Sequence, residues 1–272
     1  MTELQAQDEA MHTRRLFVAW QHPETRSIEP VALLTQTGRD KSPSQYYFSY
    51  LKRALDLDAF EPFTAFPDMG RLYSSLKLFP FFANRSMSRK RSDYGRTLEL
   101  LDLSVDAEPF EVLGRSGGQR ATDSLEVFPE PERDPVTGLG RCLFFVRGIR
   151  YFPTFEDALE ELAVGDRLRM LVDIQNPKNS DAVLLAKQDL RTLGYVPDYL
   201  VPHVYTALQN CGAGDVRVEV EHLNGPGTPR HMRMLCRLTT CWPPAYRPFS
   251  QPEYQAVVEA PTPAVALTSA AS

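Results

Sequence analysis

The side chains that most often carry catalysis are scattered along this sequence of 272 residues. Its five histidines are His12, His22, His203, His222 and His231. No Gly-x-Ser-x-Gly, His-Glu-x-x-His or paired-carboxylate signature accompanies them. A metal-dependent nuclease would need several converging carboxylates; Asp166, Asp173 and Asp181 are available, but Asp166 and Asp181 stand at positions that turns favour anyway. The sequence therefore predicts a protein that is not an enzyme and uses no cofactor.

The four cysteines, Cys142, Cys211, Cys236 and Cys241, show no Cys-x-x-Cys spacing. The amino-terminal residues 1–13 contain acidic side chains and no apolar stretch of the kind found in secretion signals. Without an export signal, free thiols and a cytoplasmic location are expected. A zinc site formed by the last two cysteines with His222 and His231 is conceivable, but the spacing is irregular. The sequence around Cys236 is more typical of a strand with buried thiols.

Positive charge is concentrated in one segment of an otherwise acidic chain. The formal net charge is −5, which argues against a surface built for non-specific nucleic-acid binding. Between Arg71 and Arg96, however, seven basic residues accompany one acidic residue. The segment is either a phosphate-contact surface, in which case Arg85, Arg89, Lys90 and Arg91 are the candidate DNA-binding residues, or a solvated loop and helix face. The sequence leaves both readings open.

A glycine-rich stretch, GRSGGQRATDS, follows that segment. It lacks the Lys-Ser/Thr pair that completes a phosphate-binding loop, so Gly117 and Gly118 are better explained by a turn that requires positive φ.

The composition, and the positions of the prolines and glycines, predict an α+β protein with two domains. The prolines, glycines and charges of residues 129–141 mark the boundary. We expect a disordered segment over 1–13, a small mixed α/β domain over 14–134, a β-barrel with short helices over 135–252, and a flexible tail over 253–272. No stretch approaches the ~20 apolar residues that a membrane helix needs, so no membrane partner is expected.

The first domain is predicted to begin with paired strands over residues 16–20 and 31–35, followed by a strand that passes into a helix near residue 50. A loop rich in Pro and Phe comes next. Its expected apolar anchors are Tyr73, Leu76, Leu78 and Phe79. A helix is then expected over residues 94–103, with Ser92 or Asp93 as its N-cap, and a short helix and a strand complete the domain.

The second domain carries motifs that resemble the HIRAN domain, a small β-barrel of the OB type. The resemblance covers about residues 140–210. It consists of a Val-x-Gly-x-x-Tyr element, an Asn-Pro turn and a Gly-Tyr-x-Pro element, at Val146, Gly148, Tyr151, Asn176, Pro177, Ala182, Gly194, Tyr195 and Pro197. The alternative reading is that these residues serve turn chemistry and half-buried packing alone.

The HIRAN resemblance implies binding of single-stranded DNA or DNA ends. On that reading Arg150 and Tyr151 offer a cation and a ring side by side, Tyr195 a second stacking surface, and Lys178 a phosphate contact. Eukaryotic members carry Tyr-Asp after the Asn-Pro pair, where this chain has Lys178 and Asn179. The departure removes a stacking ring and favours backbone contacts over recognition of a terminal hydroxyl.

The first domain, over about residues 14–128, resembles the N-terminal subdomain of HipA-type kinases, through RRLFVAW, the Phe-rich loop, LFPFFANR and the glycine loop. No kinase catalytic loop follows. Together with the HIRAN resemblance, this implies a bacterial, non-enzymatic DNA-binding protein; the setting in genome maintenance or defence, with helicase or nuclease partners, is implied by that resemblance alone. The alternative is a protein-contact module that binds and restrains a separate HipA-like kinase.

Overall fold

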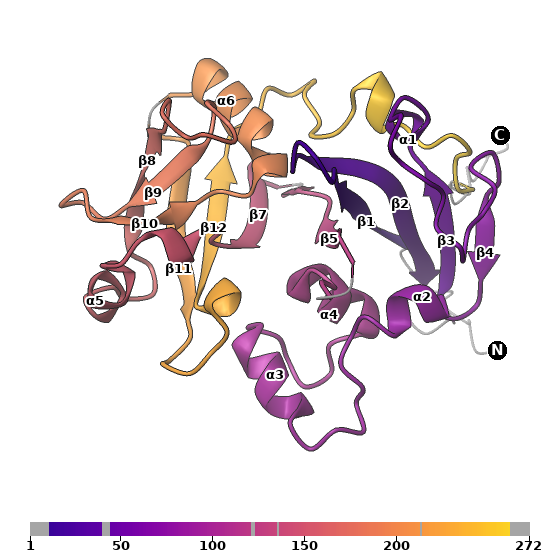
Figure 1. The fold of residues 1–272 in the computed structure, drawn as a ribbon, viewed down its shortest axis with the longest axis horizontal. Coiled ribbons are helices and arrows are strands. Elements are labelled where there is room, and N and C mark those ends of the chain that lie inside the picture. The colour runs from indigo at the N-terminus through magenta and orange to yellow at the C-terminus, as the bar shows by residue number, and fades with distance from the viewer. Residues whose placement is uncertain (1–10, 40–43, 121–122, 135, 213, 262–272) are drawn as a thin grey trace, which may run out of the picture.

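A computed structural model describes residues 11–39, 44–120, 123–134, 136–212 and 214–261. Two antiparallel sheets stand side by side, and short helices fill the space below the seam between them (Figure 1). The chain passes from the first sheet to the second between Pro129 and Glu132, inside the segment whose prolines and charges predicted a boundary. Mixed helices and antiparallel strands confirm the α+β class.

The first sheet has the strand order β4-β3-β2-β1-β5. Its strands are β1 (Met11–Gln21), β2 (Ile28–Arg39), β3 (Gln45–Tyr50), β4 (Tyr73–Ser75) and β5 (Leu125–Pro129). The helices of this half are α1 (Lys52–Leu55), α2 (Pro80–Ala83), α3 (Tyr94–Leu100) and α4 (Pro109–Ser116). The predicted pairing of residues 16–20 with 31–35 is confirmed, since Leu16 lies opposite Leu34 and Val18 opposite Ala32.

Aromatic rings fill the core of the first half. Phe48, Phe66 and Phe82 are almost completely buried, and the Phe48 and Phe66 rings stack with centroids 3.9 Å apart. Tyr50 is buried beside them and donates its hydroxyl hydrogen to the Phe66 carbonyl at 2.9 Å. Among the expected anchors of the Pro- and Phe-rich loop, Tyr73, Leu78 and Phe79 pack against this cluster. The prediction for Leu76 was wrong: it is 71% exposed, because it follows the short strand β4 on the solvent side.

The second sheet has the strand order β10-β9-β8-β11-β12-β7-β6. Its strands are β6 (Glu132–Arg133), β7 (Gly140–Phe145), β8 (Arg167–Val172), β9 (Val183–Ala186), β10 (Thr192–Tyr195), β11 (Arg217–Leu223) and β12 (Met234–Thr240). The helices of this half are α5 (Phe155–Glu160) and α6 (Val201–Asn210), with 3₁₀ turns η1 (Ile149–Tyr151), η2 (Asp198–Leu200) and η3 (Arg230–Met232). A last 3₁₀ turn, η4 (Pro252–Tyr254), lies near the carboxyl end.

The second sheet curls so that its two ends approach each other. Just beyond β7, Arg147 forms an isolated antiparallel bridge with Tyr195 of β10, through backbone hydrogen bonds of 2.9 and 2.8 Å. The bridge is not extended into a ladder, and no closed barrel forms among the described strands. The expected barrel is thus found as a curled, open sheet.

Two apolar clusters join the halves. One contains Leu98 of α3 and Leu101 just after it, together with Phe145 and Leu235 of the second sheet. The other contains Phe17 and Phe128 of the first sheet with Phe249, and Phe128 stacks on Tyr199 with centroids 3.7 Å apart. Buried apolar contact at both places fixes the relative position of the two sheets.

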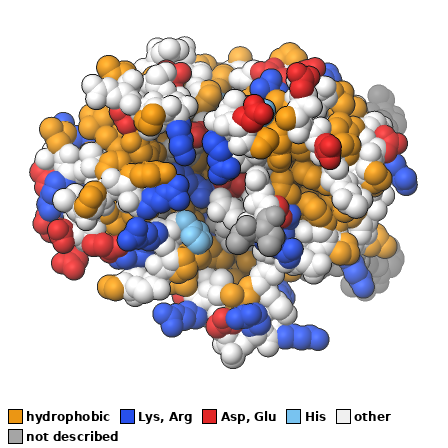
Figure 2. All heavy atoms as spheres, viewed as in Figure 1, with side chains coloured by type: hydrophobic (Ala, Val, Ile, Leu, Met, Phe, Trp, Pro, Cys, Tyr) orange, Lys and Arg blue, Asp and Glu red, His pale blue; other side chains and the backbone are white. Residues whose placement is uncertain are grey.

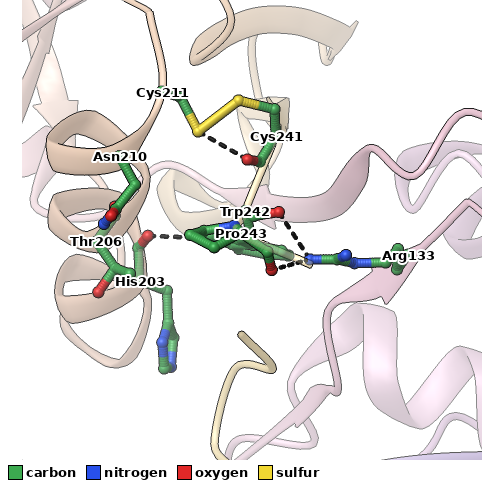
Figure 3. Close-up of a disulfide and its surroundings, with 8 residues drawn as sticks. All are labelled: Arg133, His203, Thr206, Asn210, Cys211, Cys241, Trp242 and Pro243. Atoms are coloured by element: carbon green, nitrogen blue, oxygen red, sulfur yellow. Dashed lines mark hydrogen bonds between the residues drawn. A yellow bond between two sulfur atoms is a disulfide. The ribbon is translucent and has the colours of Figure 1, made fainter. Parts of the chain in front are cut away.

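The cysteines correct the sequence interpretation. Cys211, which follows α6, and Cys241, which follows β12, form a disulfide across 30 residues (Figure 3). Cys142 and Cys236 are free and buried; free thiols had been predicted for all four cysteines. The pair was missed because sequence spacing carries no sign of it: the packing of α6 against the end of β12 brings the two Cα atoms to 6.1 Å. Among the described residues no group of His, Cys, Asp or Glu could hold a metal ion.

The chain from Pro252 to Val258 returns to the first sheet. Ala256 bridges Leu51, the Val257 amide donates to the Tyr50 carbonyl at 2.8 Å, and the Val258 amide donates to Ser49 Oγ at 3.2 Å. Residues 255–258, which we expected to belong to a flexible tail, are therefore paired with residues 49–52 at the end of β3 and the start of α1. Residues 262–272 of that predicted tail, and residues 1–10 of the predicted disordered segment 1–13, lie outside the described residues. For residues 11–13 the prediction of disorder was wrong, because they begin β1 and pair with residues 37–39 of β2. No described helix is long and apolar enough to span a bilayer.

Candidate nucleic-acid interface

A groove of about 940 Å³ runs along the seam between the two sheets, at the upper end of the ~300–1,000 Å³ typical of ligand pockets. Three carboxylates line it, from Asp123, Glu126 and Asp198. The cations that line it are Arg26, Arg120, Arg147, Arg150, Lys178 and Arg230. Figure 2 shows Lys and Arg side chains gathered near the middle of this face, with a histidine beside them. An acidic protein therefore carries a groove with a local excess of positive charge.

The Arg150–Tyr151 pair lies on the rim of this groove, on turn η1. Tyr151 is 56% exposed, and the Arg150 guanidinium lies 4.8 Å from the centre of its ring. Arg150 Nη2 donates to the Tyr151 hydroxyl at 2.6 Å. This hydrogen bond and the positive charges of Lys178 and Arg150 lower the pKa of Tyr151. More than half of Tyr151 is therefore exposed for contact with a planar group, and a cation accompanies it.

Two glycines make the geometry of this rim. Gly148 has φ of 68°, and a Cβ atom there would lie 2.8 Å from the Tyr195 ring. Gly194 has φ of 150°, and a Cβ there would lie 2.5 Å from both the Arg147 carbonyl oxygen and Val146 Cγ1. The Val-x-Gly and Gly-Tyr elements of the sequence thus cross at a distance that only glycine permits. Their crossing places Tyr151 and Tyr195 in one groove.

Tyr195 is held more firmly than the sequence indicated. Its hydroxyl donates to Asp173 Oδ2 at 2.8 Å, and its ring packs 5.5 Å from that of Phe152. Burial, followed by the bond and charge of Asp173, raises the pKa of Tyr195. Half-buried and anchored at its tip, Tyr195 lines the groove and offers less surface than Tyr151.

The Asn-Pro turn forms the third part of the rim. Asn176 Oδ1 accepts the amides of Lys178 and Asn179 at 3.0 and 3.3 Å, and Asn179 Oδ1 accepts the amide of Asp181 at 2.9 Å. The two asparagines therefore shape the turn through their own backbone, as side-chain-capped turns do. Lys178 is exposed at its tip, and Asn179 Nδ2 is 3.3 Å from Asp198 Oδ1. The turn presents a cation to the groove, and its asparagine amides are already engaged.

The floor of the groove joins the two halves. Arg147 Nη2 forms an ion pair with Glu126 Oε1 of β5, and His231 lines the groove close enough for the charge of Arg147 to lower its pKa, after the larger effect of burial. Sequence reasoning missed Arg147, Glu126 and the cations of the first half. Arg147 had a sequence signal, since it stands inside the Val-x-Gly element; the others had none.

The second set of predicted site residues does not line the groove. Arg85 has only 4% of its side chain exposed and binds both carboxylate oxygens of Asp123, at 3.0 and 2.6 Å. Arg89 donates to the Ala107 carbonyl at 2.7 Å, and Arg91 pairs with Asp93 at 2.8 Å. Lys90 is exposed on the same loop. The loop of residues 85–91 therefore uses three of its four cations in its own structure.

No protein-family model matches the chain, and a comparison with curated proteins gives no match. Among solved structures, a protein from Lactobacillus plantarum is similar at 17% identity and a TM-score of 0.29, over 38% of this chain and 99% of that one. The HIRAN domain of human HLTF is similar at 15% identity and a TM-score of 0.28, over 37% of this chain and 74% of that one. These TM-scores are too low to establish a shared fold, so the site rests on its own geometry. The HipA resemblance of the first half stays a prediction.

Proposed function

We propose that this protein binds single-stranded DNA in the groove between its two sheets, without catalysing a reaction on it. The observation that carries the proposal is the exposed Tyr151 ring with the Arg150 guanidinium beside it. Single-strand-binding grooves combine cations that contact phosphates with aromatic rings on which bases stack. Both kinds of contact are present here within two adjacent residues.

The charges around the pair support the same function. Lys178 lies close enough to Tyr151 to affect its ionisation, and Arg147 and Arg230 line the same groove. A strand whose base stacks on Tyr151 would therefore find its neighbouring phosphates in a positive field. The overall charge of −5 would oppose binding elsewhere on the surface, so binding would be confined to the groove.

The arrangement favours internal nucleotides and phosphates over a terminal hydroxyl. Asn179 is engaged with Asp181 and Asp198, and Lys178 supplies positive charge at the neighbouring position. Recognition of a terminal hydroxyl needs an acceptor that is not already hydrogen-bonded. Phosphates, in contrast, are attracted by the positive charges of Lys178 and Arg150. We therefore propose contacts along the strand, with helicase or nuclease activity supplied by other proteins.

The test is fluorescence anisotropy with labelled single-stranded DNA, single-stranded RNA and duplex DNA. Wild-type protein is expected to bind the single-stranded DNA most tightly. Replacing both residues of the pair (Arg150→Ala, Tyr151→Ala) should weaken binding by at least about tenfold, because one stacked base contributes roughly 1–3 kcal/mol.

The matched control is Arg96→Ala, which removes a cation exposed on α3 and outside the groove lining; it should leave affinity unchanged. Circular dichroism would establish that the variants fold. Equal affinity of the wild type and the pair variant would refute the assigned site, and preference for duplex or RNA would refute the assigned ligand.

A further inference from the structure

The first half of the chain forms the wall of the groove that faces the Arg150–Tyr151 rim. Its cations and side-chain amides come from two places far apart in sequence. Gln21 ends β1 and Arg26 lies on the turn that follows, and Gln119 and Arg120 lie on the segment between α4 and β5. All four side chains carry N–H donors, and two of them are cations. The sequence predicted a contribution from this half through Arg85, Arg89, Lys90 and Arg91, none of which lines the groove, and it did not predict these four residues.

This wall is shaped by its own local contacts. Arg26 has φ of 62°, its amide donates to the His22 carbonyl at 3.0 Å, and its carbonyl accepts from Gln21 Nε2 at 3.1 Å. The backbone of the hairpin is thus held while the Arg26 side chain is exposed. Arg120 is tied through Nη2 to the Asn84 carbonyl, which leaves its other N–H groups available to a ligand, since a guanidinium carries five.

The two walls are held at a fixed separation. Arg147 of the second half pairs with Glu126 of the first at the floor, and Tyr199 stacks on Phe128 with an interplanar angle of 4°. A further tie connects the halves where Asn224 Nδ2 donates to the Leu100 carbonyl at 2.8 Å. Since buried contacts lie at several points along the seam, a ligand entering the groove meets both walls without a hinge movement.

We infer that the DNA strand is clamped between the two halves, with one wall holding a base and the other holding phosphates. The Arg150–Tyr151 rim takes the base, and Arg26 and Arg120 take phosphates further along the strand. The preferred ligand is then an unpaired strand several nucleotides long, and the curled sheet alone is an incomplete site. This inference rests on the proposed function and extends it to the first half of the chain.

The test is a length series of labelled oligothymidylates, from roughly 4 to 16 nucleotides, measured with the whole chain. Wild-type affinity should rise with length until both walls are occupied. The double variant Arg26→Ala, Arg120→Ala should bind the shortest oligomers as the wild type does, stop gaining affinity at a shorter length, and be about tenfold weaker on the longest. Its salt slope should also be shallower by about 1.4, because each lost phosphate contact on a single strand changes it by about 0.7.

Three controls keep the outcomes distinct. Arg26→Glu, on an exposed turn, serves if loss of the Arg120–Asn84 contact prevents folding of the double variant; it should weaken long oligomers more strongly than short ones. Arg96→Ala should follow the wild type at every length. The Arg150→Ala, Tyr151→Ala variant should be weaker at all lengths.

The inference is overturned if the Arg26 and Arg120 variants follow the wild type at every length while the rim variant loses affinity. In that case the proposed function stands and the strand contacts only the second half. If the wild type binds no oligomer, the proposed function itself fails and the inference fails with it.

Discussion

Positive charge is arranged in two ways in this protein: the cations of one loop are close together in sequence, whereas those of the groove come together only in the fold. The loop of residues 85–91 contains four cations within seven positions, yet Arg85, Arg89 and Arg91 are occupied by Asp123, the Ala107 carbonyl and Asp93. The groove draws its cations from five separate segments of the chain. The contrast teaches that local density of charge is a poor guide to a binding site. What matters is whether the fold brings the cations to one cavity, because Arg120 and Arg147 line the groove although they have partners in the Asn84 carbonyl and Glu126.

The physical basis of the contrast is the cost of burial. A guanidinium placed among apolar groups must be paired and hydrogen-bonded, so Arg85, over the Phe81 ring at 4.7 Å and almost fully buried, is tied to a carboxylate. Arg150 is exposed and donates to the neighbouring Tyr151 hydroxyl, so it can contact a phosphate without a buried charge losing its partner. We therefore expect the loop to contribute to stability, and we propose that the groove contributes to binding.

The largest expected effect is on stability, from Arg85→Ala. The substitution leaves Asp123 without its bidentate partner and removes the cation from the Phe81 ring, so we expect a loss of about 3 kcal/mol in the free energy of unfolding. Urea denaturation measures it. The matched control, Arg96→Ala, should change stability by less than about 0.5 kcal/mol. If the Arg85 variant is as stable as the wild type, the loop does not contribute to stability in this way, and the distinction drawn between the loop and the groove is wrong.

A smaller effect is expected from acid, through the seam that holds the groove walls. His203 is buried, lies 4.2 Å from the Phe249 ring, and has Nδ1 2.7 Å from the Tyr246 hydroxyl oxygen. Burial lowers the pKa of His203 from 6.5 to about 4. Between these two pH values the unfolded chain therefore binds a proton at His203 that the folded chain does not bind. The stability that neutral His203 contributes is present above pH 6.5 and falls as the pH approaches 4.

Between neutral pH and pH 5 this histidine should account for a loss of about 2 kcal/mol. Unfolding of the wild type and of His203→Gln, measured across that range, isolates its share, because the carboxylates titrate equally in both proteins. Parallel pH profiles would show that His203 accepts its proton in the folded state, and that the seam is looser than its packing indicates.

The smallest effect should come from the loop of residues 85–91 acting on binding. The triple variant Arg89→Ala, Lys90→Ala, Arg91→Ala removes three charges outside the groove lining, and ions screen such charges beyond about 10 Å. We expect single-strand affinity to change by less than about twofold at physiological salt. Anisotropy with the same oligomers measures it. A loss comparable to that of the Arg150→Ala, Tyr151→Ala variant would transfer the site to this loop.

Much of the local structure followed from the sequence. The apolar runs at residues 16–20 and 31–35 predicted paired strands, and Asp93 was correctly named as a candidate N-cap position of α3, although its side chain caps no amide there and instead pairs with Arg91. The Asn-Pro turn behaves as its residues predict. These features depend on contacts between residues a few positions apart, so the local sequence is enough to predict them.

Only part of the candidate site could be predicted from the sequence. The motif around Gly148 and Gly194 predicted that Tyr151 and Lys178 belong to one site, and both line the groove. The close crossing of the two chain segments requires glycine at both positions, and a required glycine can be recognised in the sequence. The cluster from Arg85 to Arg91 misled, since its partners Asp123 and Ala107 lie 38 and 18 residues away along the chain. No sequence pattern indicated that Arg26 and Arg120 would line the groove.

By itself, the sequence determined the α+β class, most of the strands, the turn chemistry of the second half and the ring and cation at Tyr151 and Arg150. Tertiary structure alone decided that Cys211 pairs with Cys241, that Leu76 faces solvent, and that the first half walls the groove. The physical reason is the range of the interactions. Hydrogen bonding within turns and alternation within strands are local, whereas the partner of a buried cation or thiol depends on how whole sheets pack.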